Sequence, residues 1–210
     1  ATGCLDGYAR VFLCDDLSQF GESLPFGFSY GAEIDFSKDN KLLLARSTLG
    51  RDSNNVVVWD IQTSKELFRL KHQSGIMNHL FSSDGKTVFT CSKDNTVKMW
   101  SLIDGSLLGV FNHSQRPVAM GELSSNIGSL FTLDELGCSR IWDINTEQII
   151  DGPFKGLPGE GWLMKTKAMP LSSAFVSSYG NDSLAYWYSP ISEYIAGNDN
   201  CLLYTSRAHE

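Results

Sequence analysis

The sequence predicts an all-β chain made of one repeated unit of short antiparallel strands. Two observations carry this prediction: aromatic residues recur at nearly equal spacing, and β-rich runs bounded by turn residues come before them. No long stretch has a convincing helical period. The 210 residues, with 42% hydrophobic and 20% charged side chains, have the composition of a globular protein.

The repeat is most visible in its aromatic anchors. TCSKDNTVKMW at 90–100 aligns without a gap on TGCLDGYARVF at 2–12, so that Trp100 falls on Phe12. The five anchors, spaced by 47, 41, 42 and 45 residues, are Phe12, Trp59, Trp100, Trp142 and Trp187. A period of about forty residues built from strands is typical of a β-propeller blade.

Each unit contains strands and turns in a constant order. The strand that comes before each Trp anchor is predicted from β-rich runs at 41–47, 87–92, 129–134 and 173–178. FSKDNK at 36–41 and FSSDGK at 81–86 precede two of these runs, and their Asp-Asn and Asp-Gly pairs suit turns with positive φ. Further turns follow three anchors at 63–67, 103–108 and 145–150, and each leads into another short strand. The unit is therefore four short antiparallel strands.

On these residues, the chain resembles the WD40-repeat family. Trp59-Asp60 and Trp142-Asp143 match the Trp-Asp pair that names the family, whereas Trp100 and Trp187 are followed by other residues. The family's Gly-His signature is degraded, with His72 and His113 at the places where its histidine is expected.

The resemblance covers residues 1 to about 198 and implies a partial WD40-type β-propeller. We expect about four complete four-stranded blades, at 28–71, 76–111, 117–152 and 161–198, plus part of another before them. We assign residues 1–200 to this propeller fragment. Seven blades usually close the ring in this family, so we expect further blades outside these residues.

The same resemblance implies a structural hydrogen-bond network in the central blade. Its expected members are His72, Thr90 or Ser92, Asp94 and Trp100. A His, Ser and Asp set can be mistaken for a hydrolase triad, but this one lies in a repeat and no G-x-S-x-G elbow occurs. In the next blade, Leu136 falls where Asp94 would align, so we expect an incomplete network around His113.

The segment CLLYTSRAHE at 201–210 breaks the pattern of the repeats. It resembles the translation of a transposon-end adapter used for sequencing libraries, with a one-base shift before Arg207. We therefore predict that 201–210 is a non-native, adapter-derived tail. The alternative is a genuine final strand.

Composition argues against several other functions. The net charge of −7 disfavours direct nucleic-acid binding, and the longest apolar runs are too short to span a membrane. The five cysteines form no CxxC pair, and no histidine lies at metal-ligand spacing from Cys, Asp or Glu, so we expect no metal. GLPGEG at 156–161 lacks the lysine of a phosphate loop. The acid pairs Asp15-Asp16 and Asp134-Glu135 are expected in solvated turns.

These observations predict a non-catalytic protein–protein interaction scaffold with no catalytic residues, no cofactor and no small-molecule substrate. We expect protein partners and an intracellular location, in the cytoplasm or nucleus. The family resemblance implies partner contacts at the turn before the third strand and at the loop that leads into each blade. The corresponding candidates are Lys93, Arg116 and Trp162, although solvation of Lys93 and Arg116 and core packing of Trp162 explain these residues better.

Two alternatives stay open. The chain is the sensor or regulatory propeller of a larger signalling ATPase or kinase, or it is a subunit of an RNA-processing or ribosome-assembly complex. A P-loop upstream would favour the first alternative, and basic tails would favour the second.

Overall fold

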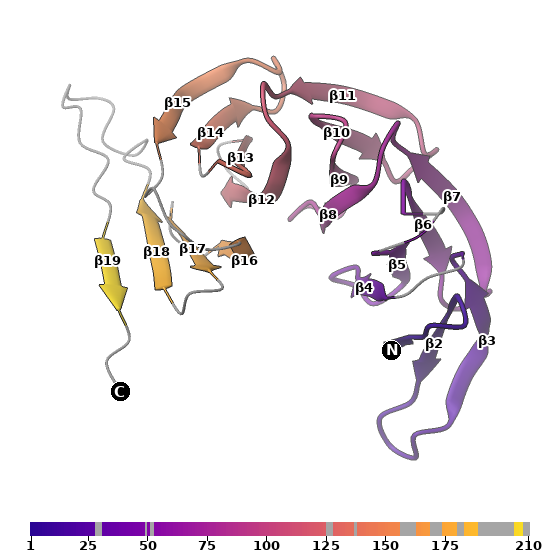
Figure 1. The fold of residues 1–210 in the computed structure, drawn as a ribbon. Coiled ribbons are helices and arrows are strands. Elements are labelled where there is room, and N and C mark those ends of the chain that lie inside the picture. The colour runs from indigo at the N-terminus through magenta and orange to yellow at the C-terminus, as the bar shows by residue number, and fades with distance from the viewer. Residues whose placement is uncertain are drawn as a thin grey trace. The chain divides into compact units, whose positions relative to one another are not determined.

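The computed structural model describes residues 1–27, 31–48, 50, 53–124, 128–136 and 138–155, together with four strands beyond residue 162. Contacts divide the chain into two units, Ala1–Asn112 and His113–Glu210. Every regular element in the described residues is a β-strand (Figure 1). The expected all-β fold class is therefore confirmed.

The first unit contains three antiparallel sheets. The first sheet has three strands: β1 (Thr2–Gly3), β2 (Tyr8–Phe12) and β3 (Gln19–Pro25). The second sheet has four: β4 (Ala32–Phe36), β5 (Leu42–Ser47), β6 (Asn55–Asp60) and β7 (Lys65–Lys71). The third sheet also has four: β8 (Ile76–Phe81), β9 (Thr87–Ser92), β10 (Thr96–Ser101) and β11 (Leu107–Asn112).

The second unit contains two four-stranded antiparallel sheets. The fourth sheet consists of β12 (Pro117–Ser124), β13 (Ser129–Asp134), β14 (Cys138–Asp143) and β15 (Ile149–Lys155). The fifth consists of β16 (Leu163–Ala168), β17 (Ala174–Tyr179), β18 (Ser183–Tyr188) and β19 (Tyr204–Arg207). Four four-stranded sheets and one three-stranded sheet match the predicted four blades and part of another.

The fifth sheet differs from the expected blade in its last strand. The predicted blade ended at residue 198, but β19 comes from residues 204–207 and pairs antiparallel with β18. This strand lies within the segment that we interpreted as an adapter-derived tail. The origin of that segment stays a prediction.

The anchors occupy one register in successive sheets. Trp59 lies opposite Leu43, Trp100 opposite Val88, and Trp142 opposite Leu130. On the other side of each Trp strand, the pairing with the outer strand shifts register next to the Trp. The equal spacing of the anchors therefore reflects one repeated strand geometry.

The core of the first unit lies between its sheets. Ala9 and Leu24 of the first sheet, with Phe26 just after β3, pack against Leu43, Trp59 and neighbouring apolar residues of the second sheet. Another cluster joins the second and third sheets, and its members include Val56, Leu70, Ile76, Val88 and Trp100. Burial of this apolar surface is the main source of stability.

Arg46 also joins the second and third sheets. The buried guanidinium of Arg46 on β5 donates to the carbonyls of Ile76 and Met77 on β8, at 2.7 and 2.8 Å. Its ion pair with Glu33 on β4 spans 2.6 Å. A charged side chain thus satisfies backbone acceptors across the contact between two sheets.

The tight turns have the backbone geometry that their sequences predicted. Asn40 and Gly85 adopt φ values of 57° and 69°. Ser37 Oγ accepts from the amide of Leu42, and Ser82 Oγ accepts from the amide of Thr87, both at 2.9 Å. The prediction of positive φ in these two turns is confirmed.

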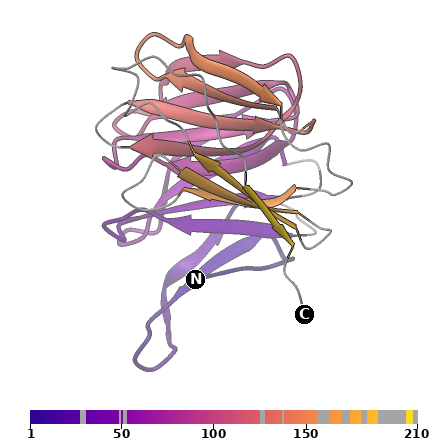
Figure 2. The same ribbon diagram turned by 90° about the vertical axis from the view of Figure 1, so that its left-hand side faces the viewer.

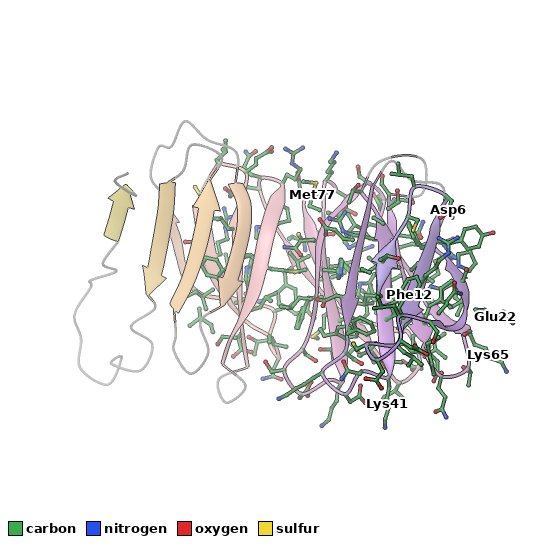
Figure 3. All side chains as sticks on the ribbon, turned by 90° about the horizontal axis from the view of Figure 1, so that it is seen from below. Asp6, Phe12, Glu22, Lys41, Lys65 and Met77 are labelled. Atoms are coloured by element: carbon green, nitrogen blue, oxygen red, sulfur yellow. The ribbon has the colours of Figure 1, made fainter. Side chains whose placement is uncertain are left out.

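The first unit has two opposite faces at the ends of its strands. Asp6 and Met77 lie at one edge, whereas Lys41 and Lys65 lie at the other (Figure 3). We call the edge that carries the turns β2–β3, β6–β7 and β10–β11 the Lys65 face. The β2–β3 hairpin projects from the first sheet as the indigo loop at the lower edge of Figure 2.

Candidate functional site

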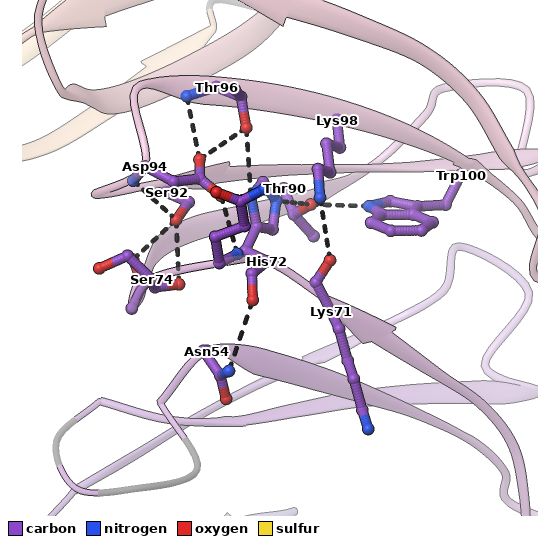
Figure 4. A network of polar contacts seen from close by, with 12 residues as sticks. Asn54, Lys71, His72, Ser74, Thr90, Ser92, Asp94, Thr96, Lys98 and Trp100 are labelled. Atoms are coloured by element: carbon purple, nitrogen blue, oxygen red, sulfur yellow. Dashed lines mark hydrogen bonds and ion pairs between the residues drawn. The ribbon is translucent and has the colours of Figure 1, made fainter.

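The third sheet holds a chain of buried polar contacts (Figure 4). His72, which follows β7, places Nδ1 2.9 Å from Asp94 Oδ2 and Nε2 2.8 Å from Thr90 Oγ1. Trp100 Nε1 donates to the same Thr90 oxygen at 2.7 Å. The structure therefore brings together His72, Thr90, Asp94 and Trp100.

The pattern of donors and acceptors assigns the protons. Asp94 accepts from Nδ1–H of His72, so Nε2 is the acceptor of the Thr90 hydroxyl, whose oxygen accepts from Trp100. Burial lowers the pKa of His72, although the hydrogen bond to Asp94 opposes that shift. A neutral His72 satisfies every group in the chain.

Asp94 ties together the two loops at this end of the sheet. Its carboxylate accepts from the backbone amide of Gln73 at 3.0 Å and from the hydroxyl of Thr96 at 2.6 Å. Burial alone would raise the pKa of Asp94, but the hydrogen bonds from Thr96, His72 and Gln73 hold the pKa below its ordinary value. The ionised carboxylate thus fixes the loop at 72–75 against the turn at 93–95.

Ser92 supports this arrangement from the neighbouring position. Its hydroxyl lies 3.0 Å from the carbonyl oxygen of Ser74 and 3.1 Å from that of Gly75, and it accepts from the amide of Asp94 at 3.1 Å. Of the two hydroxyls expected in the network, Thr90 links His72 to Trp100. Ser92 instead holds the backbone of the two loops.

The set differs from a hydrolase site in its accessibility. Thr90 has no exposed surface, and its oxygen already accepts from Trp100. A nucleophile has to reach its substrate, so this Thr–His–Asp geometry is suited to holding loops.

The fourth sheet keeps the tryptophan contact and changes the rest. Trp142 Nε1 donates to Thr132 Oγ1 at 2.8 Å. Asp134 at the end of β13 accepts from Arg140 of β14 at 2.9 Å and from the amide of Cys138. Asp134 is buried, so the expectation that it lies in a solvated turn is wrong. Arg140 compensates its charge inside the sheet.

His113 occupies a different environment from His72. Arg140 lies 3.4 Å from its Nδ1, and no polar atom of the described residues partners its buried Nε2. Burial and the nearby Arg140 lower the pKa of His113 to about 4. His113 therefore lacks the carboxylate that holds His72.

Sequence reasoning missed the pair of Asp134 and Arg140. Arg140 precedes Trp142 by two residues, as Lys98 precedes Trp100, and Asp134 aligns with Ser92. The signal was present in this alignment, since a strand residue of either charge needs a partner when it is buried.

The second sheet lacks the acceptor for its tryptophan. Trp59 Nε1 is buried, and among the described residues no polar atom partners it. Ala45 lies opposite Val57, as Thr90 lies opposite Lys98, so Ala45 takes the place of the threonine. The network is therefore specific to individual sheets.

Comparison with known proteins identifies the repeats. The family model for the WD domain, G-beta repeat, matches residues 64–101, which run from the turn before β7 to the end of β10. Residues 64–101 therefore form a WD40 repeat.

Curated relatives of this chain include a subunit of a larger complex and a protein with several kinds of domain. The chain is 27% identical over 179 residues to the target of rapamycin complex subunit wat1 of Schizosaccharomyces pombe. This alignment covers 83% of the chain and 48% of the relative. It is 34% identical over 127 residues to human NACHT domain- and WD repeat-containing protein 1. That alignment covers 56% of the chain and 8% of the human protein. The chain thus spans about half of the first relative and much less of the second.

A solved structure shows a similar fold. The crystal structure of the computationally designed Ika8 protein superposes with a TM-score of 0.65 at 20% identity, and the match covers 89% of this chain and 54% of Ika8. This likeness concerns the fold alone.

The three predicted partner-binding residues fall in different settings. Lys93 is exposed in the turn next to Asp94. Arg116, just before β12, forms an ion pair with Glu135 at 2.5 Å. Trp162 lies outside the described residues. Their binding role stays a proposal.

Metal ligation and membrane insertion are two further possibilities for the described part of the chain. There, no group of three or more His, Cys, Asp or Glu side chains could hold a metal ion. Within the same residues, no helix has the length and apolar character needed to cross a bilayer.

Proposed function

We propose that this WD40 chain is a non-catalytic scaffold for protein–protein interactions. The observation that carries the proposal is the network around Asp94, which locks the loop at 72–75 and the turn at 93–95 on one face of the third sheet. Rigid loops on a packed scaffold lose little conformational entropy when a partner binds. The kinship with a subunit of a target of rapamycin complex supports the same proposal.

Lys93, Arg116 and Trp162 are the proposed partner contacts. Lys93 supports this role best, because its exposed ammonium extends from the turn that Asp94 anchors. Arg116 is held by Glu135, which would pre-orient its guanidinium for a partner. The partner would be an intracellular protein, in the cytoplasm or nucleus, and we expect no direct contact with nucleic acid.

Quantitative binding tests the scaffold. A partner isolated with the chain would be purified, and its affinity for the chain measured by calorimetry. Lys93→Glu should weaken binding by about tenfold, as loss of one contact of about 1.4 kcal/mol does. Lys86→Glu, on the opposite face, is the matched control and should leave binding unchanged. Equal affinity for both variants would remove Lys93 from the site.

A second function is favoured by one relative. The name of the human relative records a NACHT domain together with WD repeats, so a propeller of this kind occurs beside another domain. By analogy, this chain would be the regulatory propeller of a larger signalling ATPase. Sequencing the parent transcript outward from residues 1–200 tests this function, because an upstream P-loop would support it and further repeats alone would favour the scaffold.

A further inference from the structure

The exposed apolar side chains of the first unit gather on the Lys65 face. Nine large apolar side chains are exposed among its described residues, and all except Leu5 and Tyr8 lie in the turns of this face or in the first three residues of β3, β7 and β11. Leu17 is 75% exposed and Ile103 is 85% exposed. Such clustering marks interaction surfaces more often than scattered single residues do.

One row of these side chains repeats with the anchors. Phe20, Leu67 and Leu108 each follow their anchor, Phe12, Trp59 or Trp100, by eight residues. All three are at least 37% exposed at the start of an outer strand. We call Leu17, Phe20, Leu67, Ile103 and Leu108 the apolar rim.

Contacts between neighbouring sheets bring together the strands and turns that carry the rim. The amide of Glu22 on β3 donates to Ser64 Oγ in the β6–β7 turn at 3.1 Å. A Cβ added at Gly105 in the β10–β11 turn would lie 2.5 Å from the ring of Phe68 on β7. Each outer strand thus lies directly against a turn of the next sheet, and the strands follow one another along the edge in Figure 1.

Leu17 is also strained at its position. It adopts φ 58°, which side chains without a local hydrogen-bonding group rarely do. The matching turn positions in the second and third sheets are occupied by Ser64 and Gly105, with φ values of 54° and 73°. A bulky apolar residue in this conformation gains little from burial, because it is mostly exposed. Its presence therefore calls for a reason outside the fold.

Acidic side chains accompany the rim. Asp15 and Asp16 lie beside Leu17, and Asp104 follows Ile103. Glu66, which precedes Leu67, is instead paired with Arg69 at 2.7 Å. Hydrogen bonds from Ser18 lower the pKa of Asp16, and those from Ser101 and Ser106 lower the pKa of Asp104. Asp16 and Asp104 therefore give the apolar surface a negative border beside Leu17 and Ile103.

We infer that the apolar rim docks a cationic amphipathic segment of a protein partner, with apolar side chains against Leu17 and Leu108 and lysine or arginine side chains toward Asp15 and Asp104. This inference rests on the proposed scaffold function and names a surface and a partner chemistry for it. Opposite charge would steer the segment, and burial of the apolar side chains would hold it.

Titration of the 210-residue chain with fluorescent peptides tests the inference. The probe is a short peptide of leucine and lysine, and the comparison peptides replace lysine by serine or glutamate. We expect the lysine peptide to bind best, more weakly as salt is raised. The double variant Leu17→Asn and Leu108→Ser should bind it about tenfold more weakly. Leu5→Ser removes an exposed leucine from the opposite face and should leave binding unchanged.

Each contrary result overturns a defined part of the inference. Equal binding of the lysine and serine peptides would overturn the charge argument. If the double variant binds the lysine peptide as tightly as the wild-type chain does, the rim is not the binding surface. Thermal melting checks folding, because asparagine tolerates positive φ and should not lower the melting temperature. If the wild-type chain dimerises in sedimentation and the double variant does not, the occupant is a second copy and the cationic segment is wrong.

The test is separable from that of the scaffold. A partner that binds the double variant normally but loses affinity for Lys93→Glu would overturn the rim and leave the scaffold function standing. If the lysine peptide binds the rim but no protein partner of the chain is found, the rim is supported and the scaffold function is not.

Discussion

The third and fourth sheets hold their tryptophans alike and their histidines differently. Trp100 donates to Thr90 at 2.7 Å, and Trp142 donates to Thr132 at 2.8 Å. In the third sheet the same threonine also bonds a histidine that a turn carboxylate orients. In the fourth sheet the carboxylate belongs instead to Asp134 at the end of a strand, where Arg140 binds it. The Trp–Thr contact is therefore independent of the histidine.

This difference shows two ways to tie the loops of a repeat. Asp94 uses backbone amides and a neutral histidine, so that the third sheet buries one charge near its surface. Asp134 is balanced by Arg140 deeper in the sheet, where its side chain is only 1% exposed. The second solution depends strongly on its cation, because an unpaired buried charge is costly.

The largest effect is expected from Arg140→Met. Loss of the guanidinium leaves Asp134 buried without its counter-charge, which should destabilise the protein by about 3–5 kcal/mol. Lys98→Met is the matched change in the third sheet and should cost only about 1 kcal/mol, since Lys98 is half-buried, donates to a carbonyl and lies 5.5 Å from the centroid of the Trp100 ring. Urea denaturation measures both.

A second substitution sharpens this result. Asp134→Ser introduces the residue found at the matching position, Ser92, and should restore much of the stability of Arg140→Met. Failure of this rescue would mean that Arg140 acts mainly through packing.

Substitution of the two threonines should destabilise the third and fourth sheets to different extents. Thr90→Val leaves both the Trp100 N–H and the acceptor of His72 unsatisfied, and should cost about 2–4 kcal/mol. Thr132→Val leaves only the Trp142 N–H unsatisfied, and should cost about 1–2 kcal/mol. Urea midpoints of the two variants give the order, and equal losses would show that His72 contributes nothing.

The lowered pKa of His113 predicts that the stability of the protein depends on pH. His113 has its pKa lowered from 6.5 to about 4, so as pH falls the unfolded chain binds this proton before the folded chain does. Its contribution to stability is complete above pH 6.5 and is lost between pH 6.5 and about 4, by up to about 1.4 kcal/mol per pH unit. His113→Leu should flatten the stability curve in this window. An unchanged slope would contradict the assignment of His113 as a neutral buried group.

The smallest effect is expected in the second sheet. Ala45→Thr should supply the acceptor that Trp59 lacks and stabilise the protein by about 1 kcal/mol. Thermal melting would detect the gain. A loss of stability would show instead that the added methyl and hydroxyl groups do not fit at this fully buried position.

Much of the fold could be predicted because the same sequence pattern recurs in several repeats. The strands before Trp59, Trp100 and Trp142 begin within one residue of their predicted positions, and the turn residues Asn40 and Gly85 have positive φ. Strand and turn preferences act over a few neighbouring residues, so they can be read locally. A final strand was only the alternative for 201–210, because 204–207 shares no anchor or turn with the repeats.

The sequence by itself determined the repeat unit, its strand order and the residue types at the anchors. Only the tertiary structure decided which polar groups meet: Arg140 with Asp134, Arg46 with the carbonyls of Ile76 and Met77, and Trp59 with no acceptor among the described residues. It also decided that the exposed apolar side chains of the first unit gather on one face. The physical reason is that periodicity fixes the faces of strands, whereas buried charges and surface clusters depend on residues that packing brings together from separate strands.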